Sequence, residues 1–308
     1  MTVLTPQELL QQLKQGKQFK EAELSHIDLH GETLNRANFE QAYLRGANLA
    51  KASCQQTDFT QAVLIFADLS EANLTAANLE NANLTSANLT GANFRAVQAH
   101  KVKLRDAKLD RLEAPYSHFI EADLEVARGI NLNFSGANFS KAKLTSIQLF
   151  QANFSNASLR EVNLMDATLG EISGQQINLV KALLTHSRWS NSDLTEADLM
   201  AAKGKSCQWI DLILRGSDLY STTLTHSQLT RVDFNHASLL SANLEGTHFT
   251  EVNFTNANLQ DANLEKTIWQ NVDFSNCVVT RAVFTDAQGL TAEQKEWLHH
   301  HGALNIPD

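Results

Sequence analysis

The stretch Ala72–Phe94 reads ANLTAANLENANLTSANLTGANF and repeats one pattern every five residues. In each unit a small residue, usually Ala, is followed by Asn or Asp and then by a large apolar residue, usually Leu. A period of five matches neither the 3.6 residues of a helical turn nor the strict alternation of a long strand. The chain must therefore turn every five residues.

The same register extends from residue 22 to residue 286. Of the 53 large positions between Leu24 and Phe284, 47 are Leu, Phe, Trp or Val, and in the small series 28 of 53 are Ala. The exceptions in the large series are all small residues: Cys54, Ala99, Ala114, Gly129, Gly174 and Gly204. A repeat that holds one register over this length decides the fold of the chain.

The geometry of one unit follows from its spacing. The small and large residues are two apart, so both point to the same side of an extended segment, and the Asn or Asp between them points the other way. The other two residues form a corner, where Asn, Asp, Ser and Thr can bond to the backbone. Such corners explain why 13 Gly and 3 Pro suffice. Four sides would make a coil of 20 residues, and stacked coils would be about 4.8 Å apart.

The repeated unit A-(D/N)-L-X-X resembles that of the pentapeptide-repeat proteins, and the resemblance covers residues 22 to 286. It implies an all-β fold, a right-handed quadrilateral parallel β-helix of about 13 coils. Leucine-rich repeats space their leucines unequally within a longer unit, which argues against that alternative. The pattern, together with the two helical caps predicted below, resembles cyanobacterial members of the family, whose roles are mostly unassigned and in some cases regulatory.

Both ends of such a stack need a cap, because an open solenoid exposes unpaired backbone and core. Thr5, Pro6 and Glu8 have the order of a capping box with proline at the first helical position, and Thr291 and Gln294 repeat the box. Both segments are predicted to be short helices. We therefore divide the chain into an N-terminal helical cap at residues 1–20, a β-helix at 21–286 and a C-terminal helical cap at 287–308.

Catalytic chemistry is not expected from this sequence. The unbroken register leaves no insertion from which to build a pocket with convergent polar groups, so we predict neither an enzyme nor a cofactor. Cys54, Cys207 and Cys277 occupy inward positions without metal-ligand spacing, and no metal site is predicted. No apolar run of about 18 residues occurs, so no membrane association and a cytoplasmic location are expected.

Residues 20 apart should lie directly above one another, so the outward charges can be sorted into columns. The net charge of −9 argues against direct nucleic-acid binding, which needs a concentrated positive surface. One column alternates in sign and predicts a ladder of surface ion pairs: Lys101, Glu121, Lys141, Glu161 and Lys181. Within residues 101–111 the basic side chains gather in half a coil: Lys101, Lys103, Arg105, Lys108 and Arg111.

Acidic columns keep a second function open. The best characterised branch of the family resembles B-form DNA and inhibits DNA gyrase, which requires uncompensated acidic columns. Alternating charges speak against such mimicry here, but two columns of acids remain: Asp193, Asp233 and Asp273 in one, and Asp198 and Asp218 in the other. The alternative function is therefore a DNA-mimicking inhibitor or protector of a type II topoisomerase such as DNA gyrase.

The candidate site is an apolar column. Val180, Met200, Tyr220 and Leu240 are 20 apart and would present four successive apolar side chains to solvent, although a corner can also be partly covered. Contiguous apolar surface often marks a contact site. We predict a non-catalytic rigid scaffold or protein–protein interaction module that binds an unidentified protein partner through this strip. A regulatory role and a homodimer, through the strip or the C-terminal helix, are left open.

Overall fold

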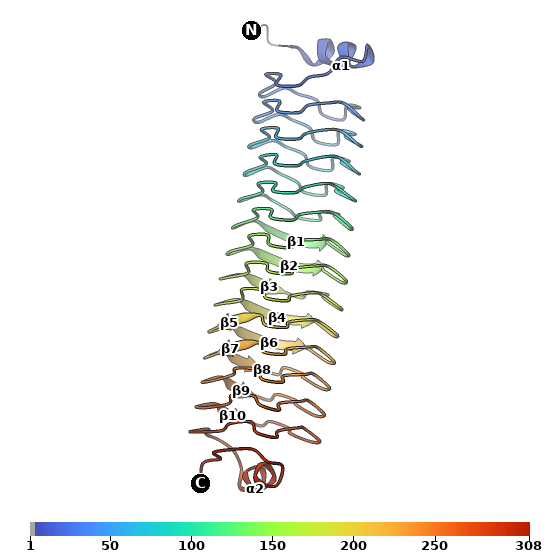
Figure 1. Ribbon diagram of the computed structural model, residues 1–308. Helices are drawn as coiled ribbons and strands as arrows, with labels where there is room; N and C mark the ends of the chain where they lie inside the picture. The colour runs from blue at the N-terminus through green and yellow to red at the C-terminus, as the bar shows by residue number, and fades with distance from the viewer. Residues whose placement is uncertain (1–3) are drawn as a thin grey trace. The chain divides into compact units, whose positions relative to one another are not determined.

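The computed structural model describes residues 4–308, so residues 1–3 of the predicted N-terminal cap lie outside the described part (Figure 1). The chain forms two compact units, unit 1 (Met1–Ala157) and unit 2 (Ser158–Asp308). Unit 1 contains α1 (Pro6–Lys14), β1 (Arg128–Asn133) and β2 (Gln148–Asn153). Unit 2 contains β3 (Thr168–Gly170), β4 (Arg188–Asp193), β5 (Lys203–Lys205), β6 (Gln208–Ile213), β7 (Thr223–Thr225), β8 (Gln228–Thr230), β9 (His248–Thr250), β10 (Ile268–Gln270) and α2 (Ala292–His300).

The pairing register confirms a coil of 20 residues. In unit 1, β1 pairs with β2 in parallel with Arg128 opposite Gln148, and shorter bridges of the same spacing begin at Glu23 opposite Tyr43. In unit 2 the strands pair in parallel in the order β3-β4-β6-β8-β9-β10 on one side of the coil, and β5 pairs with β7 on another. Each unit is a parallel β-helix built from sides of five residues.

The interior holds the two apolar series. Every large position from Leu24 to Phe284 is buried, and every small position is buried except Ala22 and Glu32, which belong to the first coil. The Asn or Asp between them points outward. The inward and outward assignments made from the sequence are thus confirmed.

Many corners are tight turns, which residues 73–77 illustrate. Ala77 N donates to Leu74 O at 2.8 Å, and Ala76 between them has a φ of 56°, so a positive φ stands at the third turn position. Asn73 Oδ1 accepts hydrogen bonds from Thr75 N at 3.1 Å and Thr75 Oγ1 at 2.7 Å. These are the side-chain-to-backbone bonds that the repeat predicted.

Where a large position holds a small residue, side chains of adjacent sides and coils fill the space. A Cβ built on Gly174 would stand 2.5 Å from Leu194 Cδ2, in the coil that follows. One built on Gly204 would stand 2.6 Å from Cys207 Sγ and 3.0 Å from Leu224 Cδ2. Both glycines are therefore required by close packing and not by backbone conformation, because neither has a positive φ.

All four tryptophans of the chain belong to unit 2. Trp189 and Trp209 are directly opposite in the β4–β6 pair, and both are buried. Trp269 stacks on Phe249 with ring centroids 4.4 Å apart. The fourth, Trp297, lies on α2. Large aromatic side chains thus accumulate in the core toward the C-terminal end of this unit.

Both predicted capping boxes are present. In α1, Thr5 Oγ1 accepts from Glu8 N at 3.3 Å while Glu8 Oε2 accepts from Thr5 N at 2.9 Å, and Leu9 is fully buried. In α2, Thr291 and Gln294 exchange the corresponding bonds. The helices therefore begin where the sequence predicted.

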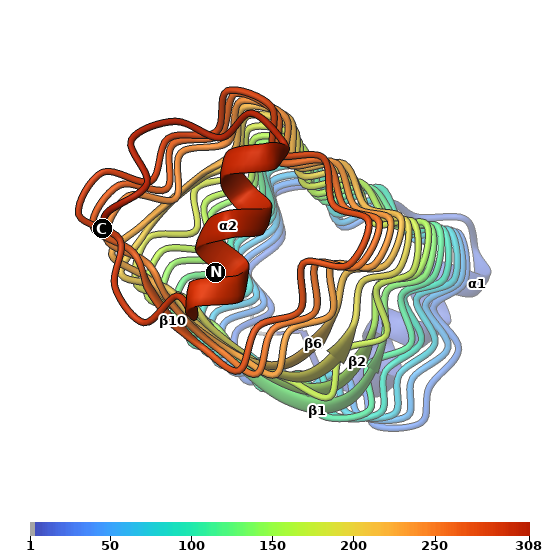
Figure 2. The same cartoon turned by 90° about the horizontal axis from the view of Figure 1, so that it is seen from below.

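The C-terminal helix closes the last coil of unit 2. Figure 2 shows α2 lying across the open end of the coils to which it is connected. Gln294 Nε2 donates to Val272 O at 2.9 Å, Trp297 stacks on Phe274 with centroids 6.3 Å apart, and Leu298 is fully buried. The helix thus donates a hydrogen bond to a backbone carbonyl of the last coils and covers the apolar core at this end, as expected of a cap.

Candidate interaction surface

The predicted strip lies along one corner of unit 2, and its residues occupy successive coils. Backbone N–H groups of one coil donate to the strip carbonyls of the next: Lys181 to Met200 at 2.9 Å, Ala201 to Tyr220 at 2.9 Å and Ser221 to Leu240 at 3.0 Å. These backbone hydrogen bonds between coils therefore hold the strip residues in register.

Only part of the strip reaches solvent. Met200 and Tyr220 are 37% and 41% exposed, Leu240 is half-buried, and Val180 is buried at 6%. The expectation that Val180 presents an apolar surface is wrong, because a short β-branched side chain keeps its carbons beside the backbone of the corner. The candidate surface is thus the pair Met200 and Tyr220, with Leu240 at its edge.

Two carboxylates lie beside this pair. Asp198 Oδ1 accepts a hydrogen bond from Met200 N at 3.0 Å, and Asp218 Oδ1 accepts one from Tyr220 N at 2.8 Å. The two aspartates are directly opposite in neighbouring coils, and neither forms an ion pair within residues 4–308. Like charges stacked this way repel, so the surface combines apolar side chains with uncompensated negative charge.

The other acidic column contains one ion pair and several hydrogen bonds. Arg215 Nε lies 2.5 Å from Asp233 Oδ2, and Gln175 Nε2 donates to Asp193 Oδ2 at 2.7 Å. Hydrogen bonds from Ser275 hold the pKa of Asp273 below its ordinary value. Arg215 thus brings positive charge to this column, whereas the hydrogen bonds to Asp193 and Asp273 leave these carboxylates ionised.

The predicted charge ladder forms in part, since Lys101 Nζ lies 3.6 Å from Glu121 Oε2. In another column, Arg231 donates two hydrogen bonds to Asp211 at 2.6 and 2.8 Å. These bonds hold the pKa of Asp211 below its ordinary value. Glu161 instead pairs with its neighbour Arg160 at 3.4 Å. The alternating column is thus only partly an ion-pair ladder.

No constellation for metal or redox chemistry stands out in the described chain. Burial raises the pKa of the Cys54 and Cys277 thiols to about 12, so neither is a reactive thiolate at neutral pH. Among residues 4–308 no three His, Cys, Asp or Glu side chains converge as metal ligands. No helix in the same range is long and apolar enough to cross a membrane.

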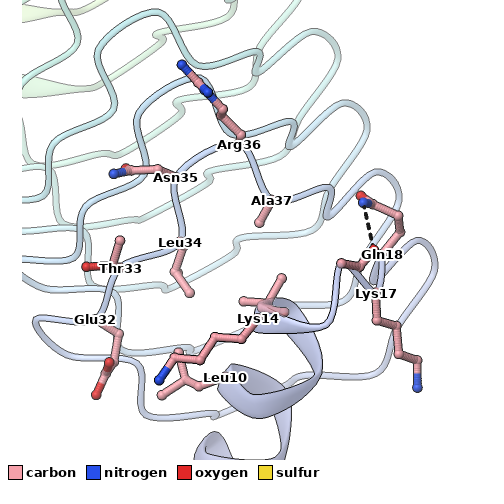
Figure 3. Close-up of a pocket in the computed structure, with 12 residues that line it drawn as sticks. Leu10, Lys14, Lys17, Gln18, Glu32, Thr33, Leu34, Asn35, Arg36 and Ala37 are labelled. Atoms are coloured by element: carbon pink, nitrogen blue, oxygen red, sulfur yellow. Dashed lines mark hydrogen bonds between the residues drawn. The ribbon is translucent and has the colours of Figure 1, made fainter.

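A pocket of about 430 Å³ opens between α1 and the first coils of unit 1 (Figure 3). Its basic side chains include Lys17, whose Nζ donates to Gln12 at 2.6 Å, and Arg36, whose Nε donates to Gln56 at 2.9 Å. Neither His nor Cys is among its lining residues.

A second exposed apolar pair was not predicted from the sequence. Ile130 and Phe150 are directly opposite in the β1–β2 pair and are 42% and 39% exposed. The signal that could have found them is the same as for the strip, since they are two apolar outward residues 20 apart.

The structure defines a class of protein: a parallel β-solenoid with five-residue sides and helical caps, carrying its exposed apolar pairs on corners. The family profile described as pentapeptide repeats matches the chain at residues 22–53, 37–75, 72–111, 116–145, 217–256, 227–265 and 257–288. The chain belongs to the pentapeptide-repeat family. No curated protein matches it.

Several solved structures are similar to this chain. A trypsin-treated form of QnrB1, a plasmid-mediated fluoroquinolone resistance protein, is 16% identical over 70% of this chain and 96% of its own, with a TM-score of 0.43. HetL, a pentapeptide repeat protein involved in heterocyst differentiation regulation from the cyanobacterium Nostoc sp. strain PCC 7120, is 23% identical over 92% and 94%, with a TM-score of 0.21. Rfr23 from the cyanobacterium Cyanothece 51142 is 22% identical over 37% and 86%, with a TM-score of 0.21.

Proposed function

We propose that this protein is a non-catalytic scaffold that binds a protein partner through the corner formed by Met200 and Tyr220. The observation that carries the proposal is the exposure of both side chains in neighbouring coils. Other coils mostly have a polar residue at this position of the repeat, as at Thr60, Ser140 and Gln260.

The rigidity of the corner supports the proposal. Met200 N and Tyr220 N are held by the carboxylates of Asp198 and Asp218, and their carbonyls accept from the preceding coil. A surface whose backbone is fixed on both sides loses little conformational entropy when a partner binds. Tyr and Met are also enriched in protein interfaces.

The test replaces both residues with Glu. We expect Met200→Glu with Tyr220→Glu to fold as the wild type does, because both side chains are partly exposed, and to lose a partner that co-purifies from the native cell. Size-exclusion chromatography with light scattering measures whether a homodimer is lost instead. The proposal fails if the folded double variant keeps both the wild-type partners and the wild-type oligomeric state.

A matched control separates the strip from exposed apolar surface in general. Ile210 is 41% exposed in the same unit, and Thr230 occupies the equivalent position of the next coil, so Ile210→Thr should fold normally. The control is expected to keep partner and oligomeric state. A loss as large as that in the double variant would show that the effect is not specific to the strip.

A second candidate function is inhibition or protection of a type II topoisomerase by DNA mimicry. The stacked, unpaired carboxylates of Asp198 and Asp218 favour it. A supercoiling assay with DNA gyrase tests it. Inhibition at stoichiometric protein that is lost in Asp198→Asn with Asp218→Asn would establish this function in place of the first, whereas no effect on gyrase would remove it.

A further inference from the structure

We propose that unit 1 carries a docking site for an acidic peptide segment of a partner protein, one with an apolar residue among its carboxylates. The site is the outward face of β1 and β2 with the coil before them, and we call it the basic–apolar face. Its residues are Lys108, Arg111, Arg128, Ile130 and Phe150.

These residues are close neighbours in the stack. Lys108 lies opposite Arg128, and Ile130 lies opposite Phe150, each pair in adjacent coils. Arg111 N donates to Ile130 O at 2.8 Å, which places Arg111 on the other side of the apolar pair. All five residues are exposed. Basic side chains thus flank two adjacent apolar ones.

The arrangement of charges on this face differs from that in other coils. In other coils several stacked basic residues are paired with an acid, as Arg281 is with Asp261 at 2.6 Å. Here two cations are directly opposite, and within residues 4–308 neither Lys108, Arg111 nor Arg128 forms an ion pair or a side-chain hydrogen bond. Directly opposed like charges destabilise a parallel stack. An anionic partner would relieve that repulsion.

The carboxylates of Asp110 and Glu113 form no ion pair with these cations within residues 4–308. Asp110 Oδ1 accepts a hydrogen bond from Ile130 N at 3.0 Å, and Glu113 Oε2 accepts one from the side chain of Asn133 at 2.8 Å. Both carboxylates therefore accept hydrogen bonds from the next coil.

The apolar half of the face also favours a peptide. Ile130 and Phe150 stand where other coils have Ser190, Thr230 or Thr250, so the repeat itself does not require apolar residues here. An apolar side chain of a peptide can pack between Ile130 and Phe150. The flanking cations and the apolar pair together fit carboxylates on either side of an apolar residue.

The experiment measures fluorescence anisotropy of the labelled peptide Gly-Glu-Glu-Leu-Glu-Glu-Leu-Gly with the full chain. We expect saturable binding that weakens as salt is raised and that is lost when Gln replaces Glu in the peptide. Lys108→Gln with Arg128→Gln should weaken binding about fivefold to tenfold. Ile130→Thr with Phe150→Thr should weaken it by a similar factor.

These variants are designed to fold. Gln stands at the equivalent position of Lys108 and Arg128 in other coils, at Gln148 and Gln208, and Thr stands at that of Ile130, at Thr230. Far-UV circular dichroism and urea midpoints check folding. The charge-matched control, expected to bind as the wild type does, replaces two exposed lysines of β5 by the residues opposite them in β7: Lys203→Thr and Lys205→Thr.

Three results would overturn the proposal. One is the absence of saturable binding to the Glu-Leu peptide, and another is equal affinity for its Gln counterpart or an equal loss in the β5 control. The third is displacement of the peptide by a twelve-nucleotide oligo(dT) that binds more tightly and loses affinity in the Lys108 and Arg128 variant, which would assign the face to nucleic acid. The site lies in unit 1, so its failure leaves the Met200 and Tyr220 proposal untouched.

Discussion

Replacing Ala76 with Gly should stabilise the protein, although the same change at Ala77 should destabilise it. Ala76 is an exposed corner residue with a φ of 56°, in the left-handed region that L side chains rarely adopt. Ala77 follows it, has no positive φ and is fully buried in the core. Two adjacent alanines thus stand in opposite physical situations.

The magnitudes follow from these two environments. A left-handed conformation costs a non-Gly residue about 1–2 kcal/mol, and Gly loses about 0.5–1 kcal/mol more conformational freedom on folding than Ala. Ala76→Gly should therefore raise the free energy of unfolding by about 0.5–1 kcal/mol. Ala77→Gly removes a buried methyl worth about 0.8 kcal/mol and adds the same entropy cost, so it should lower that free energy by about 1–2 kcal/mol.

Urea unfolding followed by far-UV circular dichroism measures both changes, with equal slopes required for the comparison. Ala96→Gly repeats the test one coil further on, where φ is 55°. If Ala76→Gly and Ala96→Gly lower the urea midpoint as Ala77→Gly does, the left-handed corner carries no conformational cost. The reasoning about the corners would then be refuted.

Three further predictions concern packing, a buried hydroxyl and pH. Gly204→Ala should cost about 1–3 kcal/mol because the new methyl meets Cys207 Sγ, and Cys207→Ala should recover part of that loss in a double-mutant cycle of unfolding free energies. Thr57→Val should cost about 0.5–1.5 kcal/mol in the same assay, because the buried Thr57 hydroxyl donates to a carbonyl of the preceding coil at 2.8 Å. Arg231 holds the pKa of Asp211 below its ordinary 3.8, so this pair stabilises the fold above that pH and the contribution is lost as pH falls through the lower, folded-state pKa. Asp211→Asn should accordingly lose less stability than the wild type between pH 5 and about pH 2.5 in urea titrations, and an identical pH profile would contradict it.

The fold was predictable because one physical constraint acts at every repeat. The interior of a coil admits one large and one small side chain per side, so the spacing of Ala72 and Leu74 already reports which residues point inward. The capping boxes at Thr5 and Thr291 were equally readable, since each is a local hydrogen-bond pattern. Sequence positions 20 apart did prove to be stacked neighbours.

The surface was less predictable, because the register fixes Cα positions and leaves long side chains free to choose partners. Glu161 pairs with Arg160 and not along its column. Val180 is in register with Met200 yet buried, since exposure depends on side-chain length at a corner. The left-handed backbone of charged residues such as Lys101 was also not predictable from their local conformational preference. A contact between coils holds it, since Lys101 N donates a hydrogen bond to Ile120 O of the next coil.

The confinement of all tryptophans to unit 2 makes the chain its own spectroscopic reporter. Trp189, Trp209 and Trp269 are buried, so their emission should shift to longer wavelength when unit 2 unfolds. Unit 1 has no tryptophan, so it contributes to the dichroism of the backbone and not to tryptophan emission. Selectively excited tryptophan fluorescence therefore reports on unit 2, while far-UV dichroism in the same urea titration reports on both units. Coincident curves would mean that the two units unfold as one cooperative block, and separated curves would give the stability of each.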